Sequence, residues 1–179
     1  MNLLVEKKFG NYYARIPLTK AAKIVHANAL RKNWEEVVPK TELSYIIGNP
    51  PFVGAAMKNK EQIEDLEFVF DNKIKHGKLD YVTAWYFIAA NFIKESSIKT
   101  AFVSTNSICQ GEQVSLLWGE LIQNQNIIIH FAHQTFDWSN AAKSNAAVHC
   151  IIVGFANFDT NQKYIFEYKN IKEEFTVLK

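Results

Sequence analysis

Hydrophobic residues recur at helical spacing in three stretches of the chain. This spacing predicts helices over residues 63–74, 80–94 and 112–123. The first helix carries many charges on its other face, so we expect it on the surface, with the acidic side chains from Glu61 to Asp71 in water. The second helix has a wide apolar arc, which predicts deep packing.

Runs of apolar residues before, between and after these helices predict strands. The runs cover residues 22–26, 43–48, 100–103, 127–131 and 148–155. The last three runs lack polar alternation, as strands do when both faces of their sheet are covered. The order of strands and helices along the chain is typical of an α/β protein.

The connections between the strands predict their directions. The helix over residues 112–123 supplies the crossover that parallel neighbours need, so we expect the strands at 100–103 and 127–131 to be parallel neighbours. Residues 133–146 are polar and lack helical spacing, which favours an antiparallel return to 148–155. The pattern therefore predicts a mostly parallel sheet with an antiparallel last strand.

The two ends of the chain add a helix tail and an edge strand. Residues 1–9 are typical of the end of a helix. Residues 157–161 indicate a turn, and Tyr164, Phe166 and Tyr168 alternate as in an edge strand.

The composition sets the scale of the protein. With 179 residues, of which 48% are hydrophobic and 21% charged, the chain can bury the core of one soluble globular domain. The formal net charge of +2 neither requires nor excludes a nucleic-acid partner. Cys109 and Cys150 lack the spacing of a metal or redox site, and the sequence shows neither a membrane span nor a signal peptide. We therefore expect a cytoplasmic protein.

The candidate chemistry lies where the strand over residues 43–48 ends. Asn49-Pro50-Pro51-Phe52 follows this strand directly, and ligands of open α/β sheets bind outside the carboxyl ends of the strands. An exocyclic aromatic amine accepts a methyl group only when its lone pair is localised on nitrogen. The side-chain oxygen of Asn49 and the carbonyl of Pro50 are two acceptors that can bind the N–H groups of such an amine.

The prolines and the aromatic residue fit the same chemistry. Pro51 fixes its own φ and restricts Pro50, so the loop is stiff, and neither residue offers an N–H that competes for the acceptors. Phe52 offers a flat face on which an extruded base can stack, a contact worth about 1–3 kcal/mol. The alternative is a stiff turn after a strand, with Phe52 as a core anchor. The preceding strand and Gly54 favour the catalytic interpretation.

A family resemblance rests on the segments IVHANALRKNW, YIIGNPPFVG, LDYVTAWYFIAA, KTAFVSTNSICQGEQV and IHFAHQTFDWSNAAKSNAAVHCIIVGF. From Phe9 onward the chain resembles the methyltransferase region of single-chain restriction–modification enzymes, which fuse a gamma-class N6-adenine DNA methyltransferase to a nuclease and a target-recognition domain. The resemblance implies a partial Rossmann-like methyltransferase fold, a three-layer sandwich, in the prokaryotic cytoplasm. The resemblance further implies that the catalytic loop is Asn49, Pro50, Pro51 and Phe52, and that the methyl donor is S-adenosylmethionine.

The resemblance also implies part of a cofactor site. In these enzymes the third strand ends in an acidic or amide residue that contacts the adenine of S-adenosylmethionine. Asn28, followed by Ala29 and Leu30, occupies that place in this sequence. An asparagine that caps or turns the chain after a strand is the alternative.

The chain departs from the family pattern before Asn28. The family binds the methionine and ribose of the cofactor on a glycine-containing loop and an acidic residue, which follow the first two strands. The seven glycines of this chain include no GxG, and no strand-then-glycine pattern precedes Asn28. We therefore expect residues 1–156 to be the later part of a catalytic domain, and residues 157–179 an edge hairpin that leads toward a downstream domain.

The absent strands have a structural consequence. In the family topology they lie between the strands that end at Asn28 and Asn49, so their absence would expose apolar surface around Ile46 and Ile47. We expect the isolated segment to be inactive and to form a homodimer through this exposed sheet edge, or to rearrange its N-terminal part.

The polar segment between the last two apolar strands is the candidate DNA contact. In the family the corresponding loop lies near the target base. This implies that Trp138, Asn140, Lys143 and Asn145 contact double-stranded DNA with a flipped adenine. For each of these residues, a place in a solvated hairpin connection is the alternative.

No metal site is expected. His130 and His149 lie inside apolar strands, and together with His133 and Cys150 they lack the spacing of structural zinc ligands. Histidines of the core or of a loop explain them better.

Two other functions fit parts of the sequence. Methyltransferases of protein glutamine or of RNA share the Asn-Pro-Pro-aromatic loop, but they usually have Tyr in place of Phe52 and lack the block from His133 to His149. A non-catalytic remnant or interaction module is the third hypothesis, because the cofactor loop is absent from this sequence. The DNA adenine methyltransferase is the preferred one.

Overall fold

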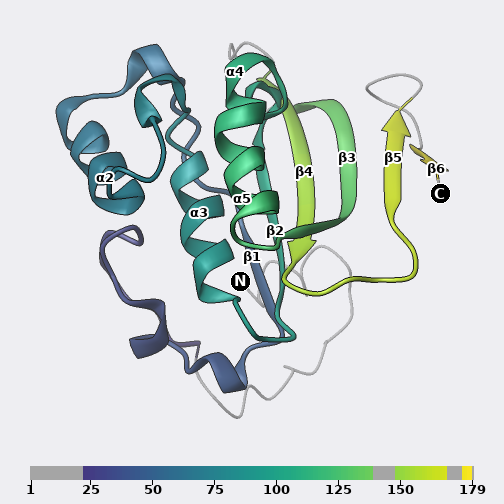
Figure 1. The fold of residues 1–179 in the computed structure, drawn as a ribbon, viewed down its shortest axis with the longest axis horizontal. Coiled ribbons are helices and arrows are strands. Elements are labelled where there is room, and N and C mark those ends of the chain that lie inside the picture. The colour runs from purple at the N-terminus through teal and green to yellow at the C-terminus, as the bar shows by residue number, and fades with distance from the viewer. Residues whose placement is uncertain (1–21, 139–147, 169–174, 179) are drawn as a thin grey trace, which may run out of the picture.

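The computed structural model describes residues 22–138, 148–168 and 175–178 and contains a six-stranded sheet (Figure 1). The strands are β1 (Tyr45–Gly48), β2 (Lys99–Thr105), β3 (Ile128–Trp138), β4 (Val148–Ala156), β5 (Tyr164–Tyr168) and β6 (Phe175–Leu178). Their order in the sheet is β1-β2-β4-β3-β5-β6. β1 pairs in parallel with β2, and β3 with β5, whereas β4 is antiparallel to both β2 and β3, and β6 to β5. Most strands therefore run in one direction, which confirms the mostly parallel α/β sheet.

The place of β4 differs from the expected neighbours. β2 and β3 run in the same direction, as predicted, but β4 lies between them and pairs antiparallel with both. The prediction that β2 and β3 are neighbours is therefore wrong, while the antiparallel direction of β4 is confirmed. A crossover helix constrains the relative direction of two strands, but the local pattern does not show how many places apart they lie.

The strand expected over residues 22–26 does not form, and this segment is irregular. Its apolar side chains are open to solvent, and Ile24 is 89% exposed. None of the described strands lies beside it. An extended segment becomes a strand only when its backbone N–H and C=O groups pair with a neighbour, so the apolar pattern alone was not sufficient.

The three predicted helices are confirmed, with different ends. They are α2 (Lys60–Phe70), α3 (Thr83–Phe92), and one continuous helical run made of α4 (Gly111–Gln113), a π-helical segment (Val114–Trp118) and α5 (Gly119–Gln123). Short 3-10 helices occupy Trp34–Glu36, Lys40–Glu42, Ala55–Met57, His76–Lys78 and Asn106–Cys109. None of the described helices is long and apolar enough to cross a membrane.

Capping residues at both ends set the bounds of α2. Asn59 caps its start in a reciprocal capping box with Gln62. The helix ends at Phe70, because the next residue, Asp71, has a φ of 42° in the left-handed region and caps it. The predicted end near Ile74 is therefore too late, although Ile74 is still buried, at 6% exposure.

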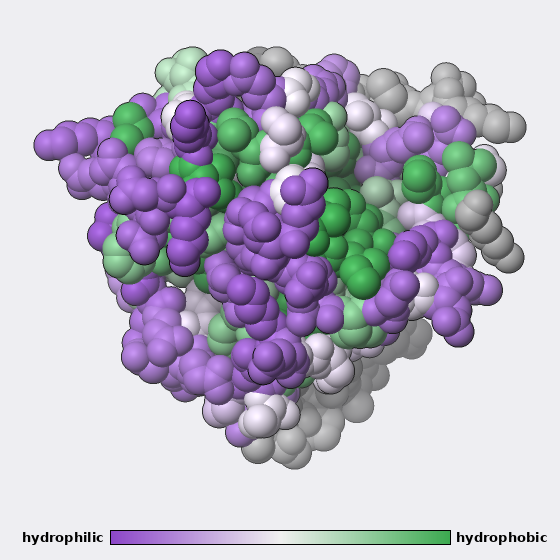
Figure 2. Space-filling model, viewed as in Figure 1, coloured by the Kyte–Doolittle hydropathy of each residue, from purple (hydrophilic) through white to green (hydrophobic). Residues whose placement is uncertain are grey.

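Tyr86 of α3 shows how the helices pack on the sheet. Its ring centroid lies 5.3 Å from that of Phe102 in β2, 5.6 Å from Phe155 in β4 and 5.5 Å from Trp118 in the π-helical segment. Its hydroxyl is 3.0 Å from the hydroxyl of Ser104. Both α3 and the α4–α5 run therefore cover the same face of the sheet, in front of the strands in Figure 1. On this side hydrophilic residues cover most of the helices, and a hydrophobic patch lies beside α5 over β4 and β3 (Figure 2).

Gly154 of β4 has no space for a side chain. Its partner across β3 is Phe131, and a Cβ at position 154 would lie 2.1 Å from the Phe131 ring. We expect Gly154→Ala to lower the free energy of unfolding by about 1–3 kcal/mol, because the ring must move. Thermal and urea denaturation measure this. In the control Gly119→Ala, a Cβ meets nothing within 4 Å. This substitution should raise the free energy of unfolding by about 0.5–1 kcal/mol, because alanine favours a helix more than glycine does. Equal stability of Gly154→Ala and wild type would contradict the close contact.

Candidate active site

The Asn-Pro-Pro-Phe loop leaves the sheet at its carboxyl edge, as predicted. β1 ends at Gly48 and pairs in parallel with β2, so both strands end at the same edge. Asn49 and Pro51 are exposed, Pro50 is buried and Phe52 is half-buried. The amide of Asn49 is therefore open to a ligand, while Pro50 anchors the loop.

The carboxylate of Asp80 holds the chain that follows this loop. Asp80 is 5% exposed. One of its oxygens accepts the backbone N–H of Ala55 at 2.8 Å. The other accepts the hydroxyl of Ser107 and, at 3.4 Å, the hydroxyl of Thr105. Asp80 thus ties the segment after Phe52 to the end of β2.

The backbone beside Asp80 adds further links. The N–H of Tyr81 donates to the carbonyl of Val53 at 2.9 Å. The N–H of Asp80 donates to the side-chain oxygen of Gln113 in α4 at 3.1 Å. The hydroxyl of Thr83 donates to the carbonyl of Asp80 at 2.6 Å and so supports the start of α3. The loop is therefore held by the segment of Asp80 and Tyr81, which is itself linked to α4 and to the end of β2.

Lys58 fastens the same segment further along. Its ammonium donates to the carbonyl of Leu79 at 2.6 Å and to that of His76 at 3.3 Å. Burial lowers the pKa of Lys58, and the nearby Asp80 charge opposes this shift without cancelling it.

Asn28 forms a turn with the residues that follow it, which was the alternative to a cofactor contact. Its side-chain oxygen accepts the N–H of Leu30 at 2.9 Å, and its backbone carbonyl accepts the N–H groups of Arg31 and Lys32. The carbonyl of Ala29 accepts the indole N–H of Trp34 at 2.8 Å. A carbonyl oxygen has two lone pairs, so the amide oxygen of Asn28 keeps the capacity to accept one more hydrogen bond.

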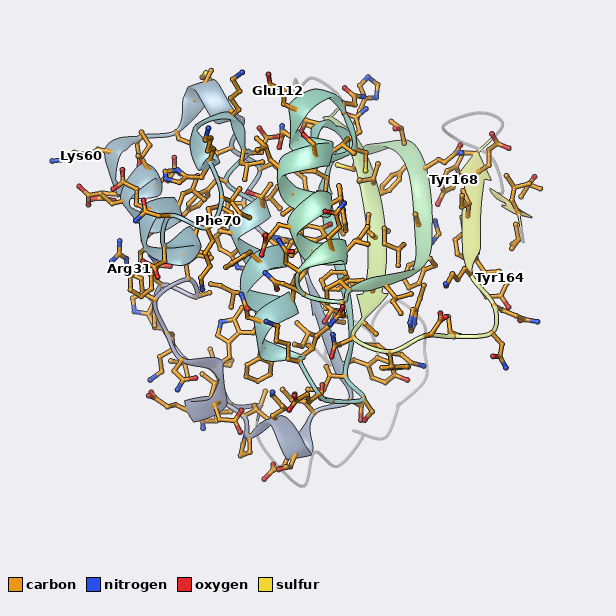
Figure 3. The ribbon with its side chains drawn as sticks, viewed as in Figure 1. Arg31, Lys60, Phe70, Glu112, Tyr164 and Tyr168 are labelled. Atoms are coloured by element: carbon orange, nitrogen blue, oxygen red, sulfur yellow. The ribbon has the colours of Figure 1, made fainter. Side chains whose placement is uncertain are left out.

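Asp65 of α2 corrects the prediction that the acidic residues of this helix are solvated. Asp65 is 5% exposed. Its carboxylate accepts the side-chain amide of Asn28 at 2.9 Å, the hydroxyl of Tyr81 at 2.7 Å and Nε of Arg31 at 2.6 Å. Arg31 lies beside α2 (Figure 3). These donors converge on one acidic group that the helical pattern placed in water.

The pKa values of Asp65 and Tyr81 are shifted by these contacts. Burial by itself raises the pKa of Asp65, but the hydrogen bonds from Tyr81, Asn28 and Arg31 outweigh burial, and the pKa lies below its usual value. Burial and the adjacent Asp65 raise the pKa of Tyr81. Asp65 is therefore a carboxylate and Tyr81 a neutral donor at neutral pH.

The two predicted sites are joined through these residues. Asn28 is hydrogen-bonded to Asp65, Asp65 to the Tyr81 side chain, and the Tyr81 backbone to Val53, next to Phe52. Sequence reasoning missed both Asp65 and Asp80. Neither had a local signal that sets it apart from a solvated acid, because Asp65 stands among other acidic residues of the helix and Asp80 lies where the next helix was expected to begin.

The two chain neighbours of Asn28, Ala27 and Ala29, line an apolar cavity of about 280 Å³. It is lined by Val25, Ala27, Ala29, Lys32, Trp34, Val37, Val38 and Leu43. Its apolar lining suits the flat face of a heterocycle.

The residues expected to contact DNA lie mostly outside the described residues. Trp138 ends β3, where its backbone pairs with Val148. Asn140, Lys143 and Asn145 belong to the part that is not described. β3 runs in the same direction as β1, so the connection from β3 to β4 starts and ends at the sheet edge where Asn49 lies.

The histidines and cysteines do not form a metal site within the described part of the chain. His130 hydrogen-bonds the carbonyl of Phe158 at 2.8 Å, and His133 the hydroxyl of Tyr168 at 2.6 Å. Figure 3 shows Tyr168 on β5, beside β3. Cys109 and Cys150 are both free thiols.

The chain is similar to known DNA methyltransferases. Residues 1–167 match the family model of the MmeI DNA-methyltransferase domain. The chain is 48% identical over 155 residues to DNA methyltransferase A of Bacillus subtilis (strain 168), and the match covers 84% of this chain but 17% of that relative. The chain therefore spans a small part of the length of this relative.

Solved structures show the same relationship. The Type IIL restriction-modification enzyme MmeI in complex with DNA matches with a TM-score of 0.86 and 47% identity, over 99% of this chain and 24% of MmeI. A modification subunit from Vibrio vulnificus YJ016 has a TM-score of 0.54 at 17% identity, over 79% of this chain and 28% of that one, and shares the fold. The resemblance to methyltransferases of restriction–modification enzymes is confirmed: the chain belongs to the MmeI DNA-methyltransferase domain family.

Proposed function

We propose that this chain supplies the catalytic loop and the adenine-binding side of the cofactor site in a DNA methyltransferase. The enzyme would transfer a methyl group from S-adenosylmethionine to N6 of an adenine extruded from double-stranded DNA, in the prokaryotic cytoplasm. The observation that carries this proposal is the exposed amide of Asn49 on a loop that Asp80 holds at the carboxyl edge of the sheet.

The proposed chemistry uses two acceptors. The side-chain oxygen of Asn49 and the carbonyl of Pro50 accept the two N–H groups of the target amine, which directs its lone pair outward. Phe52 stacks on the extruded base. The amine nitrogen would then form a bond to the methyl carbon as the bond from that carbon to the donor sulfur breaks, with the electron pair of that bond left on sulfur. The nitrogen would afterwards lose one proton to water.

The cofactor proposal rests on Asn28 and on the cavity that its chain neighbours Ala27 and Ala29 line. The amide oxygen of Asn28 is an acceptor for the exocyclic amine of the cofactor adenine, and the apolar cavity lined by Ala27 and Ala29 suits the ring. The methyl donor supplies an electrophilic carbon when bound. We expect Asn28, Ala29 and Leu30 to hold its adenine end.

The DNA proposal rests on the connection from β3 to β4. It begins and ends on the side of the sheet where β1 ends and Asn49 follows. A connection in this place is suited to contact the extruded base or its phosphates, and Trp138, Asn140, Lys143 and Asn145 are its candidate contacts.

The test of this function is the identity of the modified base. Plasmid DNA methylated in cells by a full-length methyltransferase that carries this segment is digested to nucleosides and analysed by mass spectrometry. N6-methyladenine is expected. Methylated cytosine, or methyl transfer to RNA or to a glutamine peptide but not to DNA, would overturn the proposal.

The 179-residue chain alone is expected to be inactive. Its sequence has no GxG loop, so the ribose and methionine ends of the cofactor lack their expected partners. Calorimetric titration with S-adenosylmethionine should give no measurable heat of binding. Binding with a micromolar Kd would show that the chain holds a complete cofactor site.

The isolated chain is also expected to dimerise through β1. β1 is the end strand of the described sheet, and its side chains Tyr45 and Ile47 are 65% and 81% exposed. Unpaired strand edges with apolar residues favour association. Light scattering after size-exclusion chromatography should give twice the monomer mass, and Ile47→Lys should give monomers. The control Val177→Lys changes an exposed residue of β6 at the opposite edge. A wild-type monomer would contradict this expectation.

A further inference from the structure

We propose that Asp65 is a positioning residue that sets which end of the Asn28 amide faces the cofactor, and so makes the site selective for a hydrogen-bond donor on the heterocycle. This inference rests on the proposed cofactor contact of Asn28. An asparagine amide has a donor end and an acceptor end of nearly equal shape. A site that uses one end needs another group to fix the orientation.

The contacts of Asn28 provide that group. Its NH2 donates to Oδ2 of Asp65 at 2.9 Å, and its oxygen accepts the N–H of Leu30 at 2.9 Å. If the amide turned over, its NH2 would face the N–H of Leu30 and its oxygen would face the carboxylate of Asp65. Both contacts would then be repulsive. The orientation of the amide is therefore fixed, with its oxygen toward the N–H of Leu30. The oxygen keeps one lone pair and the NH2 keeps one N–H, and the proposed cofactor contact uses the lone pair.

Asp65 is held in place for this role. It is buried at 5% exposure on α2, and Tyr81 and Arg31 donate to it at 2.7 Å and 2.6 Å. A carboxylate accepts hydrogen bonds and cannot donate them, so it cannot tolerate the turned-over amide. A neutral amide at position 65 could accept from the NH2 of Asn28 or donate to its oxygen, so it would tolerate both orientations.

The fixed acceptor distinguishes adenine from its deaminated form. Adenine presents an exocyclic N–H donor at C6, whereas hypoxanthine presents a carbonyl acceptor at the same position. The oxygen of Asn28 suits adenine and repels hypoxanthine. Without Asp65 only the N–H of Leu30 still opposes the turned-over amide, so this orientation becomes more accessible, and its NH2 can then donate to the hypoxanthine carbonyl. The loss of Asp65 should therefore reduce selectivity more than it reduces binding.

The test compares two ligands, S-adenosylhomocysteine and its inosine counterpart, with a full-length methyltransferase that carries this segment. Wild type should bind the adenine ligand about tenfold more tightly, as one hydrogen bond allows. Tyr81→Phe removes one donor to Asp65 but leaves the Asn28 contact, so it should keep this ratio. Asp65→Leu combined with Tyr81→Phe leaves no buried hydroxyl without a partner. Its ratio should fall to about threefold, because the Leu30 contact alone still favours the wild-type orientation of the amide.

Further variants distinguish the possible outcomes. Asp65→Asn keeps the shape of the side chain and one acceptor atom, so its ratio of affinities for the two ligands should lie between those of wild type and the double variant. It replaces the double variant if that protein does not fold. Glu67→Gln, on the exposed side of α2, should keep the wild-type ratio. Ratios that stay at the wild-type value in both Asp65 variants would overturn the inference. A wild type that binds neither ligand, or both equally, would overturn the proposed cofactor contact itself.

Discussion

Asn49→Ala should lower kcat of a full-length methyltransferase that carries this segment by about 10²–10³-fold, as the loss of one preorganised group at a charge-developing atom does. Alanine keeps the backbone carbonyl of Pro50 but removes the second acceptor for the target amine. The side chain of Asn49 is exposed, so the free energy of unfolding should change by less than about 0.5 kcal/mol. Steady-state methylation of a DNA duplex and thermal denaturation measure the two quantities.

The control for this variant is Asn91→Ala. Asn91 is an exposed asparagine on α3 whose side chain donates to the carbonyl of Phe87. It should keep kcat within about twofold, because it lies outside the candidate site. A kcat of Asn49→Ala equal to that of Asn91→Ala would assign the loop a purely structural role, as the stiff-turn alternative supposes.

Asp80→Ala should lower both activity and stability. It leaves the N–H of Ala55 and the hydroxyls of Thr105 and Ser107 without their charged acceptor. The free energy of unfolding should fall by about 2–3 kcal/mol, the cost of unsatisfied buried groups beside a lost charged acceptor. A displacement of the catalytic loop of about 1 Å should lower kcat by about 10²-fold. Urea denaturation and methylation kinetics measure the two effects.

Two further substitutions separate these effects. Asp80→Asn keeps an acceptor for the N–H of Ala55, so it should recover most of the stability and part of kcat. Asp71→Asn, at the exposed end of α2 with a φ of 42°, should change neither, because asparagine tolerates this conformation at least as well. If Asp80→Ala retained wild-type kcat at a temperature where it is folded, Asp80 would have no part in holding the loop.

The sequence by itself determined the local elements and the place of the motif. Helices α2, α3 and α4–α5 follow from apolar residues at helical spacing. β1 ends at Gly48 because the prolines that follow cannot continue a sheet ladder. The location of Asn49 at a strand end was therefore readable from residues within a few positions of it.

Only the tertiary structure decided the order of the sheet and the partners of the buried carboxylates. β4 lies between β2 and β3, and residues 22–26 remain irregular, because strand pairing depends on segments far apart in the chain. Asp65 and Asp80 look like ordinary solvated acids in the local pattern. Their burial depends on donors that come from Asn28, 37 residues away from Asp65, and from Ser107, 27 residues away from Asp80, and no local spacing rule reaches that far.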